Sequence, residues 1–114
     1  MKKLILSTAL ALTTMPVVAQ DNRDDVQEML GFCEEEYPTF SVGVCMGRIQ
    51  GIYEFLAFNC KYNPDGPSMD AVGVSYGAVQ QVFINWANAN PKNWNDHWAV
   101  GLATALEETF PCNN

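Results

Sequence analysis

Apolar residues recur at helical intervals in four parts of the chain. In the first part, residues 22–35, Asn22 and Asp24 are candidate N-caps, and acidic side chains fill the first turn, which is typical of a helix start. The apolar positions follow the spacing i, i+3, i+4, i+7 and are Val26, Met29, Leu30 and Cys33. The pattern predicts an amphipathic helix whose apolar face lies against the core.

The second part, residues 44–58, is apolar on two sides. One helical face holds Cys45, Ile49, Ile52, Tyr53 and Leu56, and the other side holds Met46, Phe55 and Phe58. A helix that is apolar all round is typically buried. We therefore expect a second helix here and expect it to be the most buried element.

Gly43, Gly47 and Gly51 recur every four residues along this second helix. Glycine lowers helix propensity, so a smooth glycine stripe is best explained by a neighbouring element that approaches closely. A flexible start of the helix is the alternative. On the close-approach interpretation Gly47 and Gly51 are structural positions, and Gly47→Leu should damage folding more than Gly73→Leu.

A third helix is predicted from Ser75, a candidate N-cap, to about Asn90, because Pro91 follows. An earlier start near Ser68 is left open. The apolar face of this helix holds Val79, Val82, Phe83 and Trp86.

The fourth helix is predicted from apolar residues at helical spacing, and it must end near Phe110 because Pro111 cannot continue a helix. These apolar residues are Trp94, Trp98, Leu102 and Ala105. No part of the chain alternates convincingly with period two. The sequence therefore predicts an all-α fold, a small four-helix bundle with up-down-up-down topology.

Two irregular segments connect the predicted helices. Residues 34–41 hold three successive glutamates and Pro38, which disfavours helix at Tyr37, and residues 60–75 are rich in Pro, Gly, Asn and Asp. Loops on a rigid scaffold often carry recognition. The candidate partner-binding residues in these loops are Glu34, Glu35, Glu36, Tyr62, Asp65 and Asp70.

The first 19 residues have the organisation of a secretory signal. Lys2 and Lys3 precede a mostly apolar stretch, and residues 17–19 (Val-Val-Ala) satisfy the small-residue rule for cleavage after Ala19. The apolar stretch is shorter than the roughly 18 residues that a membrane span needs. We expect a cleaved signal, no membrane attachment afterwards, and a single mature domain over residues 20–114.

Export would expose the cysteines to an oxidising compartment, where an even set of four is expected to form disulfides. Cys33 ends the first predicted helix and Cys45 begins the second, so both lie at one pole of an antiparallel pair. Cys60 and Cys112 follow the second and fourth helices and lie at the opposite pole. The topology therefore selects the pairs Cys33–Cys45 and Cys60–Cys112 from three alternatives.

The net charge of the chain argues against two classes of partner. The whole chain carries 6 basic and 13 acidic residues; without Lys2 and Lys3 the mature part keeps 4 basic residues and a net charge of −9. Binding to phosphates needs clustered cations. We therefore expect neither nucleic acid nor an anionic membrane surface as the main partner.

The residue types that carry catalysis do not form a recognisable set. His97 is the only histidine, and we interpret it as a structural or surface residue. The adjacent glutamates 34–36 point in different directions and do not resemble the paired carboxylates of a glycosidase. There is no paired CxxC spacing for a metal and no phosphate-binding glycine loop. We predict a binding protein without catalytic residues, metal or cofactor, and interpret the three tryptophans as core residues.

Four stretches of the sequence, taken in their order along the chain, resemble a known family. They are residues 45–51 (CMGRIQG), Cys60 with Pro64, residues 86–91 (WANANP) and residues 105–112 (ALEETFPC). Over about residues 26–112 they resemble the Rap/Tai family of immunity proteins, whose members share a Cys-x-Gly-Tyr-Ile-x-Gly stretch and a Phe-Pro-Cys ending. Arg48 stands where the family usually has tyrosine, Asn95 stands where histidine is often found, and the segment from Cys60 to Pro64 is longer than the family's Cys-x-Pro form.

The resemblance implies a small helical protein of the periplasm that binds peptidoglycan amidase effectors delivered by type VI secretion. The expected mechanism is occlusion, in which an irregular loop enters the catalytic groove of the enzyme. A periplasmic acid-stress chaperone, or another exported helical binding module, is the alternative. The formation of a homodimer is left open.

Overall fold

The computed structural model describes residues 24–35 and 40–113. Within these ranges the chain forms four α-helices, α1 (Val26–Glu34), α2 (Phe40–Tyr62), α3 (Tyr76–Ala89) and α4 (Trp98–Thr109), and a short 3₁₀ helix, η2 (Pro91–Asn93). The only strand-like pairing in the described ranges is an isolated bridge between Asp25 and His97. The all-α class and the four helices are thus confirmed, whereas the predicted signal and Glu36 lie outside the described residues.

Local capping determines where three of the helices begin. Asp25, and not Asp24, caps α1, and its carboxylate accepts from Glu28 N at 2.8 Å. Ser75 caps α3 as predicted and accepts from Ala78 N at 3.1 Å. His97 caps α4 through Nδ1, which accepts from Ala99 N at 3.1 Å. Each cap satisfies a backbone donor that the first turn leaves unpaired.

The start of the fourth helix differs from the prediction. Trp94 is in phase with Trp98, but it lies in the turn after η2, and α4 begins only at Trp98. The Trp94 indole donates to Ala87 O at 2.7 Å, which ties this turn to the end of α3. The predicted end is confirmed, because α4 stops at Thr109 with Phe110 as its C-cap before Pro111.

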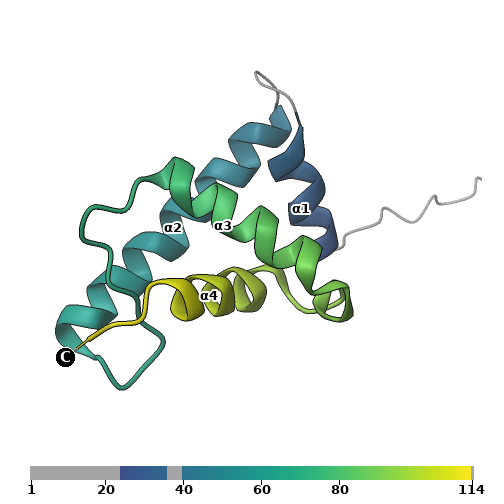
Figure 1. Ribbon diagram of the computed structural model, residues 1–114. Coiled ribbons are helices and arrows are strands. Elements are labelled where there is room, and N and C mark those ends of the chain that lie inside the picture. The colour runs from purple at the N-terminus through teal and green to yellow at the C-terminus, as the bar shows by residue number, and fades with distance from the viewer. Residues whose placement is uncertain (1–23, 36–39, 114) are drawn as a thin grey trace, which may run out of the picture.

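The helices cross one another around a shared core. In Figure 1, α1 and α2 run in opposite directions, α3 crosses α2, and α4 leads the chain back toward the C-terminal end of α2. All four helices contribute to the core, as does Met69 from the loop after α2. Its fully buried large side chains include Val26, Met29, Ile49, Leu56, Met69, Val79, Phe83, Leu102 and Leu106.

The expectation that the second helix is the most buried element is wrong. Its core face is as predicted, with Cys45, Ile49 and Leu56 buried. Phe55 and Phe58, however, are 52% and 59% exposed. When both sides of a helix are apolar, its periodicity cannot say which side packs against the rest of the fold.

The predicted close approach at the glycine stripe is also wrong. Gly43, Gly47 and Gly51 are exposed, and a Cβ at any of them would meet no atom of another described element within 4 Å. Gly73 is the strained position instead, because its φ of +75° lies in the left-handed region that favours glycine. The predicted ranking of Gly47→Leu and Gly73→Leu is therefore reversed.

A close approach that the sequence pattern missed occurs at Gly101 in α4. A Cβ there would overlap Cγ2 of Val26 and would lie 3.2 Å from Trp86 Cζ3. Gly101 therefore lets the first turn of α4 pack against the start of α1 and the side of α3.

Both predicted disulfides are confirmed. Cys33–Cys45 joins α1 to α2, with 5.1 Å between the Cα atoms. Cys60–Cys112 joins the end of α2 to the segment after α4, with 5.6 Å between the Cα atoms. No cysteine in the described residues is free. Each bridge of this kind typically contributes about 2–4 kcal/mol to stability.

Candidate partner-binding surface

The irregular segment between α2 and α3, residues 63–75, is tightly anchored to the helices. Met69 in its middle is fully buried, and its amide donates to Leu56 O at 3.2 Å. The next amide, that of Asp70, donates to Phe110 O at 2.9 Å. These bonds hold the centre of the loop between α2 and the end of α4.

Side chains from α2 fix the loop on either side of Met69. The Asn59 amide donates to Pro67 O at 2.7 Å. The Tyr53 hydroxyl lies 3.1 Å from Ala71 O and 2.8 Å from Val74 O. Because bonds run from the core helices to both halves of the loop, its backbone is held in one shape although it has no regular structure.

The tip of the loop projects from this anchored base. Residues 63–65 and Pro67 are exposed, and a turn closed by a bond from Gly66 N to Asn63 O, 3.0 Å long, shapes the tip. Asp65 lies at this tip. A rigid base with an exposed tip reduces the conformational entropy that a binding loop loses when it meets a partner.

An open groove of about 490 Å³ lies beside the base of the loop, between the C-terminal end of α2 and residues 69–72. Lys61 and Asp70 supply its charged side chains, and the rest of its lining is largely apolar: Ala57, Cys60, Met69, Ala71 and Val72, with Asn113. A mostly apolar concave surface with a few polar groups is typical of a recognition site. The sequence pattern gave no sign of this groove, because it depends on how the loop folds back.

The structure does not bring together the five predicted binding residues that it describes; the sixth, Glu36, lies outside the described residues. Asp65 and Asp70 lie in the loop at the C-terminal end of α2, while Glu34 and Glu35 lie at the end of α1. The 23 residues of α2 separate the two groups, a length of about 34 Å at 1.5 Å per residue. Glu34 and Glu35 on one side, and Asp65 and Asp70 on the other, therefore belong to two separate surfaces.

Three of these residues also have structural contacts. An Asp70 carboxylate oxygen accepts from Val72 N at 3.1 Å and so stabilises the turn. Tyr62 is the last residue of α2 rather than part of a loop, and its ring lies 4.7 Å from that of Phe58. Glu34 accepts from Asn88 Nδ2 at 3.3 Å, which links α1 to α3.

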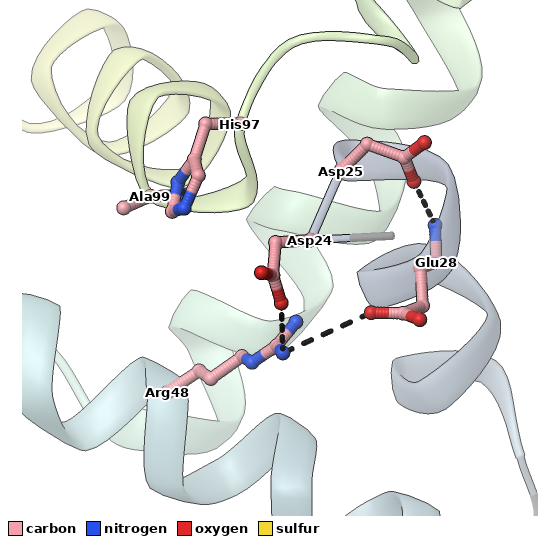
Figure 2. A network of polar contacts seen from close by, with 6 residues as sticks. All are labelled: Asp24, Asp25, Glu28, Arg48, His97 and Ala99. Carbon is pink, nitrogen blue, oxygen red and sulfur yellow. Dashed lines mark hydrogen bonds and ion pairs between the residues drawn. The ribbon is translucent and has the colours of Figure 1, made fainter. Parts of the chain in front are cut away.

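A second polar cluster lies where α1, α2 and α4 meet (Figure 2). Arg48 Nη2 is 3.6 Å from Asp24 Oδ1 and 3.8 Å from Glu28 Oε1. The guanidinium carbon lies 4.7 Å from the centre of the Trp98 ring and 5.6 Å from that of Phe32. Arg48 thus joins three helices by ion pairs and cation–π contacts. We assign this cluster a structural role.

The described residues show neither a metal-binding group of three or more suitable side chains nor a helix long and apolar enough to cross a membrane. His97 serves as an N-cap, and its Nδ1 is already bonded to a backbone amide. The loop and groove remain the features best suited to recognition.

Comparison with known proteins identifies no relative: no family model matches the chain, and neither curated proteins nor solved structures give a match. The class defined by the fold is therefore a disulfide-linked all-α domain.

Proposed function

We propose that this protein is a periplasmic immunity protein that binds a peptidoglycan amidase effector and blocks its catalytic groove. The observation that carries the proposal is the 63–75 loop, with an exposed tip on a base bonded to α2 and α4. The resemblance of residues 26–112 to the Rap/Tai family supports the choice of an amidase as the partner. Two disulfides suit such a protein to an oxidising compartment.

Occlusion requires no chemistry from the inhibitor. The tip around Asp65 would enter the substrate groove of the amidase, and the apolar groove beside it would take a side chain from the rim of the enzyme. The mature net charge of −9 would speed association with a basic groove and make the association rate fall as salt increases. The tip of the loop would then fill the groove of the amidase and keep the peptide substrate of the cell wall out of it.

The test is inhibition of a peptidoglycan amidase that co-purifies with this protein, measured as release of peptides from purified peptidoglycan. Replacing residues 65–67 (Asp-Gly-Pro) by Ser-Ser-Ser should weaken inhibition at least about tenfold, the equivalent of one lost contact of about 1.4 kcal/mol. The melting temperature should change little, because the anchoring bond at Pro67 uses its backbone oxygen, which serine keeps, and the other anchoring bonds lie outside the replaced residues. Glu108→Ser, which removes one negative charge from an exposed site on α4, is the matched control and should inhibit normally.

Two results would count against the proposal. One is full inhibition by the loop variant, which would remove the tip from the interface. The other is absence of amidase binding together with suppression of the aggregation of unrelated proteins at low pH only, which would favour a periplasmic acid-stress chaperone. A second set of variants, with Glu34 and Glu35 changed to glutamine, tests the acidic surface at the other end of α2.

A further inference from the structure

The two disulfides differ in their access to solvent. Cys33 and Cys45 are 2% and 0% exposed and belong to the hydrophobic core. Cys60 and Cys112 are both half-buried, and Cys60 also lines the open groove beside the 63–75 loop. A thiolate breaks a disulfide only if it can reach one of the two sulfur atoms. The Cys60–Cys112 bridge is therefore the one that a thiol can approach without unfolding of the core.

The place of each cysteine in the fold indicates which sulfur atom is attacked. Cys60 lies in the last turn of α2, where the core holds the helix in place, and it is reached from the groove. The other sulfur must move away once the bond breaks. Cys112 lies in the segment after α4 and belongs to none of the described helices. Attack at Cys60 with departure of Cys112 therefore requires the smaller movement of the fold.

We propose that the Cys60–Cys112 bridge is a site of reversible thiol–disulfide exchange with a dithiol protein of the Cys-x-x-Cys kind. A thiolate of the dithiol attacks Sγ of Cys60, the bond between the two sulfur atoms of the bridge breaks, and Cys112 leaves as a thiolate that is then protonated. The second thiol of the dithiol attacks the mixed disulfide and releases Cys60 as a thiol. The dithiol protein is thereby oxidised to a disulfide, and the bridge takes up the two electrons and two protons that it loses.

Opening of this bridge acts on one side of the 63–75 loop. The bridge ties the segment after α4 to the end of α2, and this segment begins at Phe110, whose carbonyl accepts from the Asp70 amide at 2.9 Å. The Met69 amide bonds instead to Leu56 O within α2, at 3.2 Å, so its anchor does not depend on the bridge. Reduction should therefore loosen the loop on the α4 side and leave it attached to α2.

The exchange site itself does not rest on amidase binding, because the position of the cysteines and of the groove defines it. Its effect on inhibition does rest on the proposed function, since the 63–75 loop is the surface that we assign to the amidase. A rigid loop loses little conformational entropy on binding, and a loosened loop loses more. The reduced form should therefore inhibit the amidase less than the oxidised form.

The first experiment follows reduction of the folded, oxidised protein by dithiothreitol, with free thiols alkylated at intervals and located by peptide mass mapping. Cys60 and Cys112 should become alkylated at least about tenfold faster than Cys33 and Cys45. The same reaction in denaturant is the control, and there the two bridges should be reduced at similar rates. Equal rates in the folded protein, or faster loss of the Cys33–Cys45 bridge, would overturn the proposal.

The second experiment tests the class of partner and the attacked sulfur. The probe is a thioredoxin-type protein in which the second cysteine of the Cys-x-x-Cys pair is replaced by serine, so that the mixed disulfide accumulates. Peptide mapping should find the probe joined to Cys60. Failure to form a mixed disulfide, or attachment of the probe to Cys33 or Cys45, would refute the exchange site, and attachment to Cys112 would refute the assigned direction of attack.

The third experiment measures amide hydrogen exchange in the double variant Cys60→Ser, Cys112→Ser, which represents the reduced form. The Asp70 amide should exchange at least about tenfold faster than in the oxidised wild-type protein, while the Met69 amide keeps its protection. Loss of helicity in this variant, or unchanged protection of Asp70, would contradict local loosening of the loop. Faster exchange at Asp70 with full inhibition of the amidase would support the exchange site and count against the loop as the inhibitory surface.

Discussion

Gly101→Ala is the substitution whose effect follows most directly from the packing. The added Cβ would overlap Val26 Cγ2 and lie 3.2 Å from Trp86 Cζ3. Val26 is fully buried and has a stiff β-branched side chain, and its amide donates to Asp96 O at 2.9 Å. Relief of the overlap would therefore require α1 and α4 to move apart.

Two opposing terms determine the size of the effect. Overpacking of a core typically costs about 1–3 kcal/mol, whereas replacing a helical glycine by alanine gains about 1 kcal/mol. Gly31→Ala on α1 brings only the gain in helix propensity, since no neighbouring atom in the described part of the chain lies within 4 Å of a Cβ there. The difference in unfolding free energy between the two variants should therefore be about 1–3 kcal/mol, with Gly101→Ala the less stable.

Thermal unfolding followed by circular dichroism, with the disulfides intact, checks this difference. For a domain of this size, 1 kcal/mol shifts Tm by about 4–8 °C, so Gly101→Ala should melt roughly 4–24 °C below Gly31→Ala. Adding Val26→Ala should recover part of the loss as a favourable coupling of about 0.5–3 kcal/mol. Equal melting temperatures for the two alanine variants would refute the close-approach interpretation of Gly101.

Two further predictions concern polar contacts. Arg48→Lys keeps the charge near Asp24 and Glu28 but loses the planar stacking on Trp98, so it should lower the unfolding free energy by about 0.5–2 kcal/mol. Urea unfolding checks this prediction, with Lys61→Arg at an exposed site as the control. Unchanged stability of Arg48→Lys would contradict the stabilising role assigned to the stacking. The Glu54 carboxylate accepts from the Tyr76 hydroxyl at 2.7 Å and raises the pKa of Tyr76 above its ordinary value of 10.0. This contact therefore stabilises the fold at pH values below the ordinary pKa of tyrosine, and its contribution to stability is lost as the pH rises through the raised pKa of Tyr76. Glu54→Gln should lower the pKa, measured from NMR shifts of the ring carbons, and an unchanged value would contradict the assignment.

Local signals in the sequence predicted most of the fold. Ser75, Pro91 and Pro111 act on their own backbone neighbours, so the ends that they predicted for α3 and α4 are close to those observed. The spacing of Val26, Met29, Leu30 and Cys33 predicted a buried face because only one side of α1 is apolar. The cysteine pairs followed from helix order alone.

The predictions that were wrong or missing concern features that depend on contacts between distant parts of the chain. Phe55 and Leu56 are adjacent and both apolar, and only the position of α3 and α4 determines which of them is buried. A glycine is equally small whether a neighbour covers it, as at Gly101, or nothing does, as at Gly47. The groove beside the loop depends on hydrogen bonds from Tyr53 and Asn59 to backbone carbonyls of the loop, which no spacing rule reveals. The sequence therefore predicted which segment forms the candidate site, but not the three-dimensional shape of that site.

The second disulfide gives the molecule an order of assembly. Cys33 and Cys45 are 12 positions apart, whereas Cys60 and Cys112 are 52 positions apart. The larger ring contains the whole 63–75 loop, together with α3 and α4. It cannot close until both of those helices have been synthesised, and it cannot close where thiols are kept reduced. The position of the loop between the two ends of this ring would therefore be fixed last, and only under oxidising conditions.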